Sequence, residues 1–357
     1  MPAPPPPDPE SLFERAGHGD QAALARLLSL VERGGSPSRA VAALAYASPG
    51  DAYTVGITGA PGAGKSTLTD RLITTARQVG LGDAPGGGGG GGSDDDGGGR
   101  VAVLAVDPSS PFSGGAILGD RVRMPSHALD SGVFIRSMAT RGHLGGLALA
   151  VPDAVRVLSA VGFPVVLLET VGVGQQEVEV ASATDTTIVV VNPGWGDAIQ
   201  ANKAGLLEIA DLFVINKADR PGARETRRDL ELMLELTELG DWRPPIVETV
   251  ASSGDGVEAL WTAIGEHRAH QLAFGTLAEH RRRRLEREFR QILVARVEQR
   301  VEALRPDPRY AEITGPMLEG ALDPYEAADR LLALLTAGPG HSGPGATGAT
   351  GAGGTGA

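Results

Sequence analysis

Short apolar runs alternate with stretches of helical periodicity through the middle of the chain. The runs are TVGIT (54–58), VAVLAV (101–106), PVVLLE (164–169), TTIVVV (186–191), LFVIN (212–216) and PIVETV (245–250). Each is short, rich in β-branched residues and apolar along most of its length, which is typical of strands buried on both faces. The alternation therefore predicts an α/β fold with a mostly parallel central sheet flanked by helices.

Helical periodicity extends beyond this alternating region at both ends. Between Leu12 and Val31 the apolar residues recur mostly at helical intervals, and residues 37–46 fit a second, short helix. Beyond residue 270 a stripe at helical spacing predicts a long amphipathic helix; it consists of Leu277, Leu285, Phe289, Ile292, Leu293, Val297, Val301 and Leu304. We therefore expect N-terminal and C-terminal helical extensions at 10–48 and 271–337 around a core domain at 49–270.

Some segments lack the apolar residues of a packed core. Residues 1–9 are rich in proline, residues 82–99 are rich in Gly and Asp, and residues 338–357 consist almost entirely of small residues. Such segments bury too little surface to offset the loss of backbone entropy on folding. We expect disordered ends and a flexible surface insertion at 82–99.

Composition and charge disfavour several kinds of partner and metal site. The 32 Lys and Arg residues against 44 Asp and Glu give a net charge of -12, which disfavours binding to nucleic acid or to an anionic membrane. The absence of Cys excludes disulfides and thiolate metal sites. The start of the chain does not read as a signal peptide, and no apolar run is long enough to span a membrane, so we expect a cytoplasmic protein.

The strongest chemical motif follows the first apolar run. The G-x-x-x-x-G-K-[ST] pattern of a P-loop lies between that predicted strand and a predicted helix, and consists of Gly59, Ala60, Pro61, Gly62, Ala63, Gly64, Lys65 and Ser66. Glycines let backbone N–H groups turn towards phosphates, and the helix N-terminus adds a favourable dipole. Lys65 is then expected to reach the β and γ phosphates, and Ser66 to offer its hydroxyl to Mg²⁺.

A second motif, Asn216-Lys217-Ala218-Asp219, ends the run LFVIN at the carboxyl edge of the predicted sheet. Asp219 can accept from the N1–H and the exocyclic amine of guanine together, whereas adenine lacks that donor pair. Asn216 is expected to bond the other edge of the base, and the stem of Lys217 to cover its face. A third loop after PIVETV, with Ala251, Ser252 and Ser253, is placed to contact the base through its backbone.

The acid expected near the metal is unusual. After PVVLL comes Glu169-Thr170-Val171-Gly172, so Glu169 stands where most GTPases carry Asp, and Gly172 keeps the backbone N–H that senses a γ-phosphate. Asp107 and Asp120 are further candidate metal-side acids, although a solvated loop acid is an equally good interpretation of Asp120. Gln175 and Gln176 follow Gly172 at an offset different from that of the usual water-orienting glutamine, and the loop residues Arg121, Arg123 and Arg141 are candidate charge stabilisers. The sequence assigns none of them to catalysis, which suggests slow hydrolysis without a partner.

These segments together resemble the methylmalonyl-CoA mutase-associated GTPase family, MeaB/ArgK. The matching stretches are GITGAPGAGKSTL (56–68), VAVLAVDPSSPFSGGAILGDRVRM (101–124), RGHLGG (141–146), ETVGVGQQEVEVA (169–181) and NPGWGDAIQANKAGLLEIADLFVINKAD (192–219). The insertion at 82–99 departs from the family pattern but interrupts none of these motifs.

The resemblance implies a GTP-hydrolysing chaperone that gates cofactor loading and protects an adenosylcobalamin-dependent acyl-CoA mutase. It implies that Lys65, Ser66 and Thr67 contact phosphate or Mg²⁺, and that a segment responsive to the mutase lies at 194–203. It also implies a homodimer formed through the C-terminal helices. An amino-acid-transport ATPase or kinase, a GTP-dependent metallochaperone and a targeting module remain as alternatives.

Overall fold

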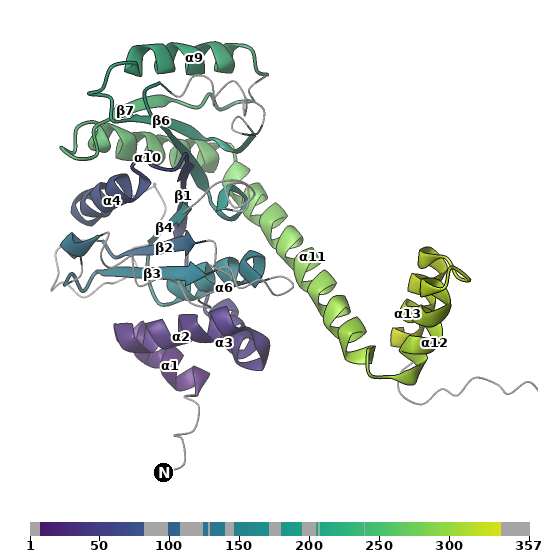
Figure 1. The fold of residues 1–357 in the computed structure, drawn as a ribbon. Helices are drawn as coiled ribbons and strands as arrows, with labels where there is room; N and C mark the ends of the chain where they lie inside the picture. Colours follow the sequence, from purple (N-terminus) through teal and green to yellow (C-terminus); the bar gives the residue numbers. More distant parts are fainter. Residues whose placement is uncertain are drawn as a thin grey trace, which may run out of the picture. The chain divides into compact units, whose positions relative to one another are not determined.

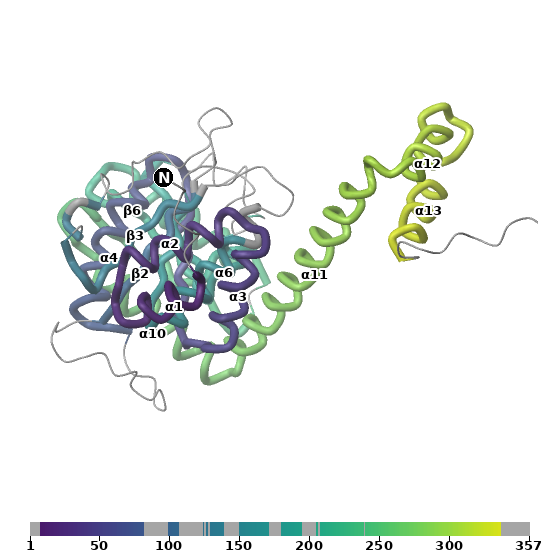
Figure 2. Tube along the Cα trace, turned by 90° about the horizontal axis from the view of Figure 1, so that it is seen from below, coloured from purple at the N-terminus to yellow at the C-terminus, as the bar shows by residue number. Residues whose placement is uncertain are grey.

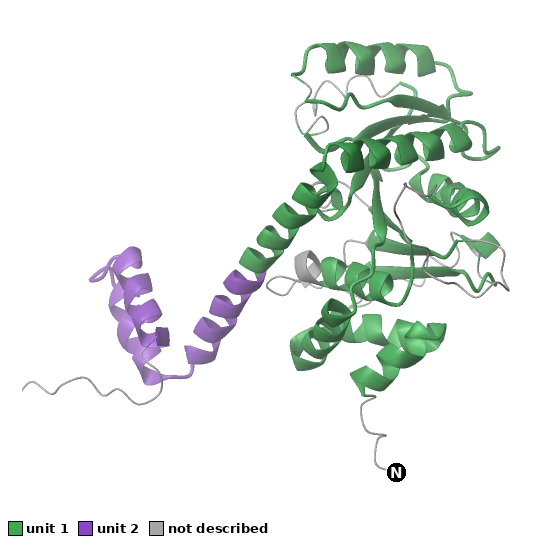
Figure 3. Ribbon diagram, turned by 180° about the vertical axis from the view of Figure 1, so that it is seen from behind, with its two compact units in different colours: residues 1–291 green, residues 292–357 purple. Residues whose placement is uncertain are grey.

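The computed structural model describes residues 8–81, 99–107, 124–127, 129–139, 146–170, 180–194, 205, 208–238 and 240–336. The chain divides into two compact units, residues 1–291 and 292–357, which Figure 3 shows in different colours. The first unit contains the sheet and every candidate site residue.

One parallel sheet forms the centre of the first unit (Figure 1). Its strands lie in the order β3-β2-β4-β1-β5-β6-β7, and every pair is parallel. Their bounds are β1 Tyr53–Gly59, β2 Val101–Asp107, β3 Val133–Ala139, β4 Val165–Thr170, β5 Thr186–Val191, β6 Leu212–Asn216 and β7 Ile246–Thr249. The predicted α/β class is confirmed, and the carboxyl ends of β1, β4, β5, β6 and β7 share one edge.

The edge strand β3 is missing from the strands expected from the sequence. Its apolar run is interrupted by Arg136 and Ser137, so the sequence gives it a weak strand pattern. In the structure the Arg136 guanidinium donates to the carbonyl of Ala25 at 2.9 Å and to the hydroxyl of Ser29 at 3.0 Å, and it pairs with Glu32. A neighbouring helix therefore supplies the acceptors for Arg136, the charged residue that weakened the strand pattern in the sequence.

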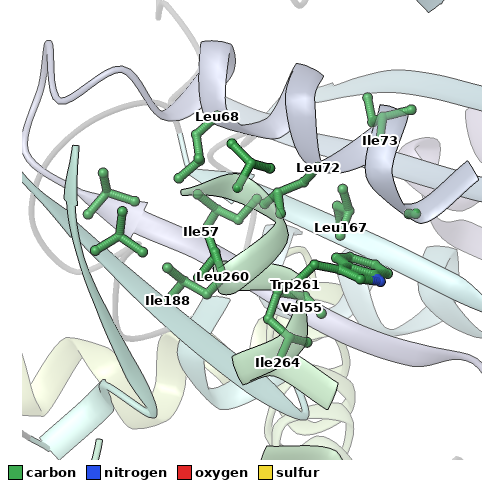
Figure 4. Close-up of a cluster of buried hydrophobic side chains, with 14 of the residues drawn as sticks. Val55, Ile57, Leu68, Leu72, Ile73, Leu167, Ile188, Leu260, Trp261 and Ile264 are labelled. Atoms are coloured by element: carbon green, nitrogen blue, oxygen red, sulfur yellow. The ribbon is translucent and has the colours of Figure 1, made fainter. Parts of the chain in front are cut away.

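Helices cover both faces of the sheet. Helices α4 (Lys65–Val79) and α10 (Val257–Ala273) lie on one face, where Leu68, Leu72 and Ile264 pack against Val55 and Ile57 of β1 (Figure 4). Helices α6 (Gly146–Ala160) and α9 (Ala223–Glu235) cover the other face. Alternate residues along each strand point to the two sides, as the pleat of a buried strand requires.

The N-terminal helices extend the α6 side of the first unit (Figure 2). They are α1 (Pro9–Gly17), α2 (Gln21–Arg33) and α3 (Gly35–Ala47), and they share one apolar core with α6. The stretch from Leu12 to Val31 is therefore two helices. The break is local, because the Asp20 carboxylate accepts from the backbone N–H of Ala23 at 2.9 Å and caps α2.

The C-terminal region is helical as expected. Helix α11 (Thr276–Leu304) is the predicted long helix, followed by α12 (Pro308–Leu318) and α13 (Pro324–Thr336). The division between the units falls inside α11. Its apolar stripe is largely uncovered, with Leu285, Phe289 and Leu293 exposed by 44%, 66% and 51%. None of the described helices is long and apolar enough to cross a membrane.

A buried polar cluster joins the start of α11 to the amino ends of β1 and β5. The Asp185 carboxylate pairs with Arg281 at 2.9 Å and with Arg284, and it accepts from the backbone N–H of Thr54 at 3.0 Å. Burial alone would raise the pKa of Asp185, but the two guanidinium groups outweigh it and hold the pKa below its usual value. Asp185 is therefore a charged anchor for α11.

The residues on either side of the segment 82–98 lie close together at the amino edge of the sheet. A Cβ on Gly99 would lie 4.0 Å from the Cα of Gly80. Trp261 donates to the carbonyl of Gly80 at 2.7 Å, and Arg77 donates to the carbonyl of Gly99 at 3.0 Å. The expected insertion itself lies outside the described residues, and both of its ends are held by the core.

Candidate functional site

The P-loop connects the end of β1 to the start of α4. Its turn depends on glycine, because Gly59 has a φ of 130° and a Cβ there would lie 2.1 Å from the carbonyl oxygen of Val190. A Cβ on Gly64, which has a φ of 90°, would lie 2.4 Å from Nδ2 of Asn216. The loop therefore sits tightly between the ends of β5 and β6.

Lys65 is the first residue of α4 and is buried, with 7% exposed. Its Nζ donates to the carbonyl of Gly59 at 2.6 Å and to that of Ala60 at 3.1 Å. Because no side chain caps α4, the backbone N–H groups of its first turn face the loop along with the ammonium group. Positive charge and N–H donors thus converge where the motif predicts phosphate.

Ser66 and Glu169 meet beside this loop. The Ser66 hydroxyl donates to Oε1 of Glu169 at 2.5 Å, and Glu169 is 2% exposed at the end of β4. A hydroxyl and a carboxylate suit Mg²⁺, which is bound by few protein oxygens together with phosphate and water. The described residues contain no group of three or more His, Cys, Asp or Glu that could hold a metal without such help.

The other predicted phosphate-side and metal-side residues are only partly placed. Thr67 is exposed in the first turn of α4. Asp107 ends β2, the strand next to β4, but its side chain is outside the described part of the chain. Asp120, Gly172 and residues 195–203 also lie outside it.

Asn216 is the junction of the site. Its Nδ2 donates to the carbonyl of Ala63 in the P-loop at 2.8 Å. Its Oδ1 accepts from the hydroxyl of Thr249 at 3.2 Å and from the backbone N–H of Ala251 at 3.1 Å. With 1% exposed, the Asn216 amide joins the P-loop to the loop after β7. The interpretation of Asn216 as a direct base reader stays a prediction.

Lys217 and Asp219 follow on the surface of the same edge. Lys217 is the only non-glycine residue with a positive φ, 61°, in the described part of the chain. This conformation brings its Nζ to 2.6 Å from the carbonyl oxygen of Gly62, so its stem runs towards the P-loop. Asp219 is exposed two residues further on. The motif thus carries an accessible carboxylate beside a covering aliphatic chain.

The loop after β7 is ordered by short-range and long-range contacts. An isolated bridge pairs Val250 with Asp255, and the Ser253 hydroxyl donates to Asp255 at 2.7 Å. From α4, Arg71 donates to the carbonyls of Ala251 and Ser252 at 3.1 and 2.9 Å. The three predicted loop residues are therefore close to the P-loop helix as well as to Asn216.

Sequence reasoning missed Arg71, Thr249 as a partner of Asn216, and Asn192. Asn192 follows β5, and its Nδ2 donates to the carbonyl of Gly62 at 3.4 Å. A polar residue at the carboxyl end of a parallel strand is a usable signal, which fits Thr249 and Asn192. Arg71 lies within a helix and carries no such signal.

Comparisons with known proteins show which family the chain is similar to. The family model described as "Methylmalonyl Co-A mutase-associated GTPase MeaB" matches residues 24–84 and 93–305. A protein of Pyrococcus abyssi that is named as a GTPase is 48% identical over 334 residues, covering 92% of this chain and 97% of that protein. The mouse protein named methylmalonic aciduria type A homolog, mitochondrial, is 34% identical over 291 residues, covering 78% and 65%.

The fold is also found among solved structures. A crystal structure described as a LAO/AO transport system kinase is similar with a TM-score of 0.64 and 25% sequence identity. The similarity covers 92% of this chain and 97% of that one.

Proposed function

Because the chain belongs to the methylmalonyl-CoA mutase-associated GTPase family, we propose that it is a GTP-binding and GTP-hydrolysing chaperone of an adenosylcobalamin-dependent acyl-CoA mutase. It would gate loading of the cofactor and protect the mutase from inactivation, with methylmalonyl-CoA mutase as the first client to test. The name of the mouse relative and the family description support that client.

The observation that supports nucleotide binding most directly is the junction at Asn216. It fixes the P-loop and the loop after β7 to each other through contacts of 2.8 and 3.1 Å. A single ligand with phosphates at one end and a base at the other fits this arrangement. Asp219 gives the base end its preference for guanine, because its carboxylate accepts from two donors that adenine does not present together.

At the phosphate end, Lys65 and the backbone N–H groups of the P-loop would bind the β and γ phosphates and stabilise their charge. Ser66 and Glu169 would hold Mg²⁺, which when bound supplies further positive charge to the phosphate oxygens. In the sequence, Gln175 and Gln176 follow Gly172 at an offset different from that of the usual water-orienting glutamine. We therefore propose that hydrolysis is slow until a partner completes the site.

We also propose a homodimer formed through the exposed stripe of α11. The stripe contains Leu285, Phe289, Leu293 and Val297, each at least 36% exposed. Aliphatic and aromatic side chains repeated along one helix in this way are typical of a helix that packs against a partner.

The client is tested by capture from a lysate of the source cells with the full chain loaded with a nonhydrolysable GTP analogue. Recovery of a cobalamin-dependent mutase, and its loss with Lys65→Ala, is the expected result. Recovery of a ribosome or a membrane receptor instead would overturn the chaperone proposal in favour of a targeting module.

Base selectivity is tested separately by calorimetry with GTP and ATP. We expect GTP to bind more tightly by at least about tenfold, since a carboxylate without its donors is unfavourable. Equal affinities would remove the guanine assignment and favour the alternative of an amino-acid-transport ATPase or kinase.

A further inference from the structure

Arg71 links the two halves of the candidate nucleotide site through one helix. It lies in the second turn of α4, the helix that begins with Lys65 and Ser66. Its Nε donates to the carbonyl of Ala251 at 3.1 Å, and its Nη2 donates to the carbonyl of Ser252 at 2.9 Å. The guanidinium thus grips two consecutive peptide groups of the loop after β7.

The loop offers few backbone donors to a ligand. The N–H of Ala251 is held by Oδ1 of Asn216 at 3.1 Å, and the N–H of Ser253 donates to the carbonyl of Val250 at 3.1 Å. Within the described part of the chain, the N–H of Ser252 has no acceptor. Of the three residues that the sequence indicates for this loop, Ser252 therefore keeps the donor that is open to a base.

Arg71 controls the direction of that donor. The carbonyl of Ala251 and the N–H of Ser252 belong to the same peptide group, which is planar and trans, so they point in opposite directions. When Nε of Arg71 holds the carbonyl, the N–H is held pointing away from α4. A second contact to the carbonyl of Ser252 fixes the next peptide group as well.

We propose that Arg71 is a positioning residue for base selectivity, acting by aiming the Ser252 N–H at the six-position oxygen of guanine. This proposal rests on the proposed binding of GTP. A fixed N–H can donate to the oxygen at that position of guanine, but it cannot form a hydrogen bond with the amino group of adenine, which is itself a donor. Arg71 thereby adds a second basis for selecting guanine over adenine to the one that Asp219 provides. It acts only through the backbone of the loop after β7, away from the phosphates.

The test compares Arg71→Ala with Arg77→Ala. Both arginines lie on α4 and both hold a loop, but Arg77 pairs with Asp130 at 2.8 Å at the other end of the helix. Dissociation constants are measured for GDP, IDP and ADP by displacement of a fluorescent guanine nucleotide. IDP keeps the six-position oxygen and the N1–H but lacks the exocyclic amine. A loss that GDP and IDP share therefore does not come from the contact between Asp219 and that amine.

For Arg71→Ala we expect GDP and IDP each to bind about tenfold more weakly, equivalent to ~1.4 kcal/mol. The affinity for ADP should stay within about twofold, because the P-loop contacts are retained. Arg77→Ala should leave the ratio of GDP to ADP affinity unchanged. Arg71→Lys should recover part of the loss, since a single ammonium group can hold only one of the two carbonyls.

An equal loss for all three nucleotides in Arg71→Ala would show that Arg71 only supports the P-loop helix, and would overturn the proposal. So would an unchanged GDP to ADP ratio. A wild-type protein without preference for GDP over ADP would instead refute the proposed function itself. Melting temperatures without nucleotide separate these results from misfolding, and Arg71→Lys keeps the test available if Arg71→Ala is unstable.

Discussion

Replacing Asn216 by alanine tests whether this residue is the structural junction of the site. The substitution removes a hydrogen bond of 2.8 Å to the P-loop and two of 3.2 and 3.1 Å to the loop after β7. All three contacts are buried. The groups that they hold, including the hydroxyl of Thr249, a residue with only 1% of its surface exposed, would lose their hydrogen-bond partner in a buried environment.

The expected size of the effect follows from these contacts. A buried hydrogen bond contributes about 1 kcal/mol net, and a buried group left unsatisfied costs roughly 1–3 kcal/mol. Losing the shared amide should therefore lower the free energy of unfolding by about 3 kcal/mol without nucleotide. GDP affinity should fall as well, because the P-loop and the loop after β7 would no longer be held together.

Urea denaturation of the nucleotide-free protein measures the stability term, and calorimetry with GDP measures the binding term. Asn192→Ala is the matched control, because Asn192 directly follows the neighbouring strand β5 and reaches the P-loop through a single longer contact of 3.4 Å. It should cost no more than about 1 kcal/mol. If Asn216→Ala is no more destabilising than Asn192→Ala, the junction has been wrongly assigned.

Three further predictions concern other parts of the chain. Lys65→Ala and Asp219→Ala should each abolish detectable GTP binding in calorimetry while leaving the circular dichroism spectrum unchanged; retained affinity in both variants would refute the site. Asp185→Asn should lower the free energy of unfolding at pH 7 by roughly 3 kcal/mol in urea denaturation, because the charge that pairs with two arginines of α11 is lost. The pKa of Asp185 is lowered in the folded state, so its contribution to the free energy of unfolding is complete above about pH 4 and is lost as the pH falls through the folded pKa. The difference in unfolding free energy between wild type and Asp185→Asn should therefore narrow in acid. A difference that stays constant with pH would contradict the pairing. The double variant Phe289→Asp with Leu293→Asp should change a homodimer into a monomer in analytical ultracentrifugation, and an unchanged sedimentation coefficient would show that the stripe is not the interface.

The sequence predicts the parts of this molecule whose chemistry is local. The strand before the P-loop, the loop and the helix after it are adjacent in the chain, so spacing alone predicts that Lys65 lies at the start of the helix beside the loop. The strand that ends in Asn216 is likewise an uninterrupted apolar run. Since such runs are buried on both faces of a parallel sheet, they also predict the fold class.

Features that depend on contacts between distant segments escaped prediction. Strand β3 carries Arg136, whose charge is acceptable only because α2 supplies its acceptors. Arg71 looks like any polar residue of an amphipathic helix until the loop containing Ala251 folds against it. The bridging role of Asn216 was hidden for the same reason, because its partners are far apart in the sequence.

The meeting of Gly80 and Gly99 at the amino edge of the sheet has a practical consequence. Closing a longer loop between two fixed ends adds little entropy cost, about 0.6 kcal/mol for each doubling of its length. The parallel strands place this point at the edge opposite the P-loop. A fluorescent protein or an affinity tag could therefore replace residues 82–98, giving a labelled molecule in which the edge that carries the P-loop remains accessible.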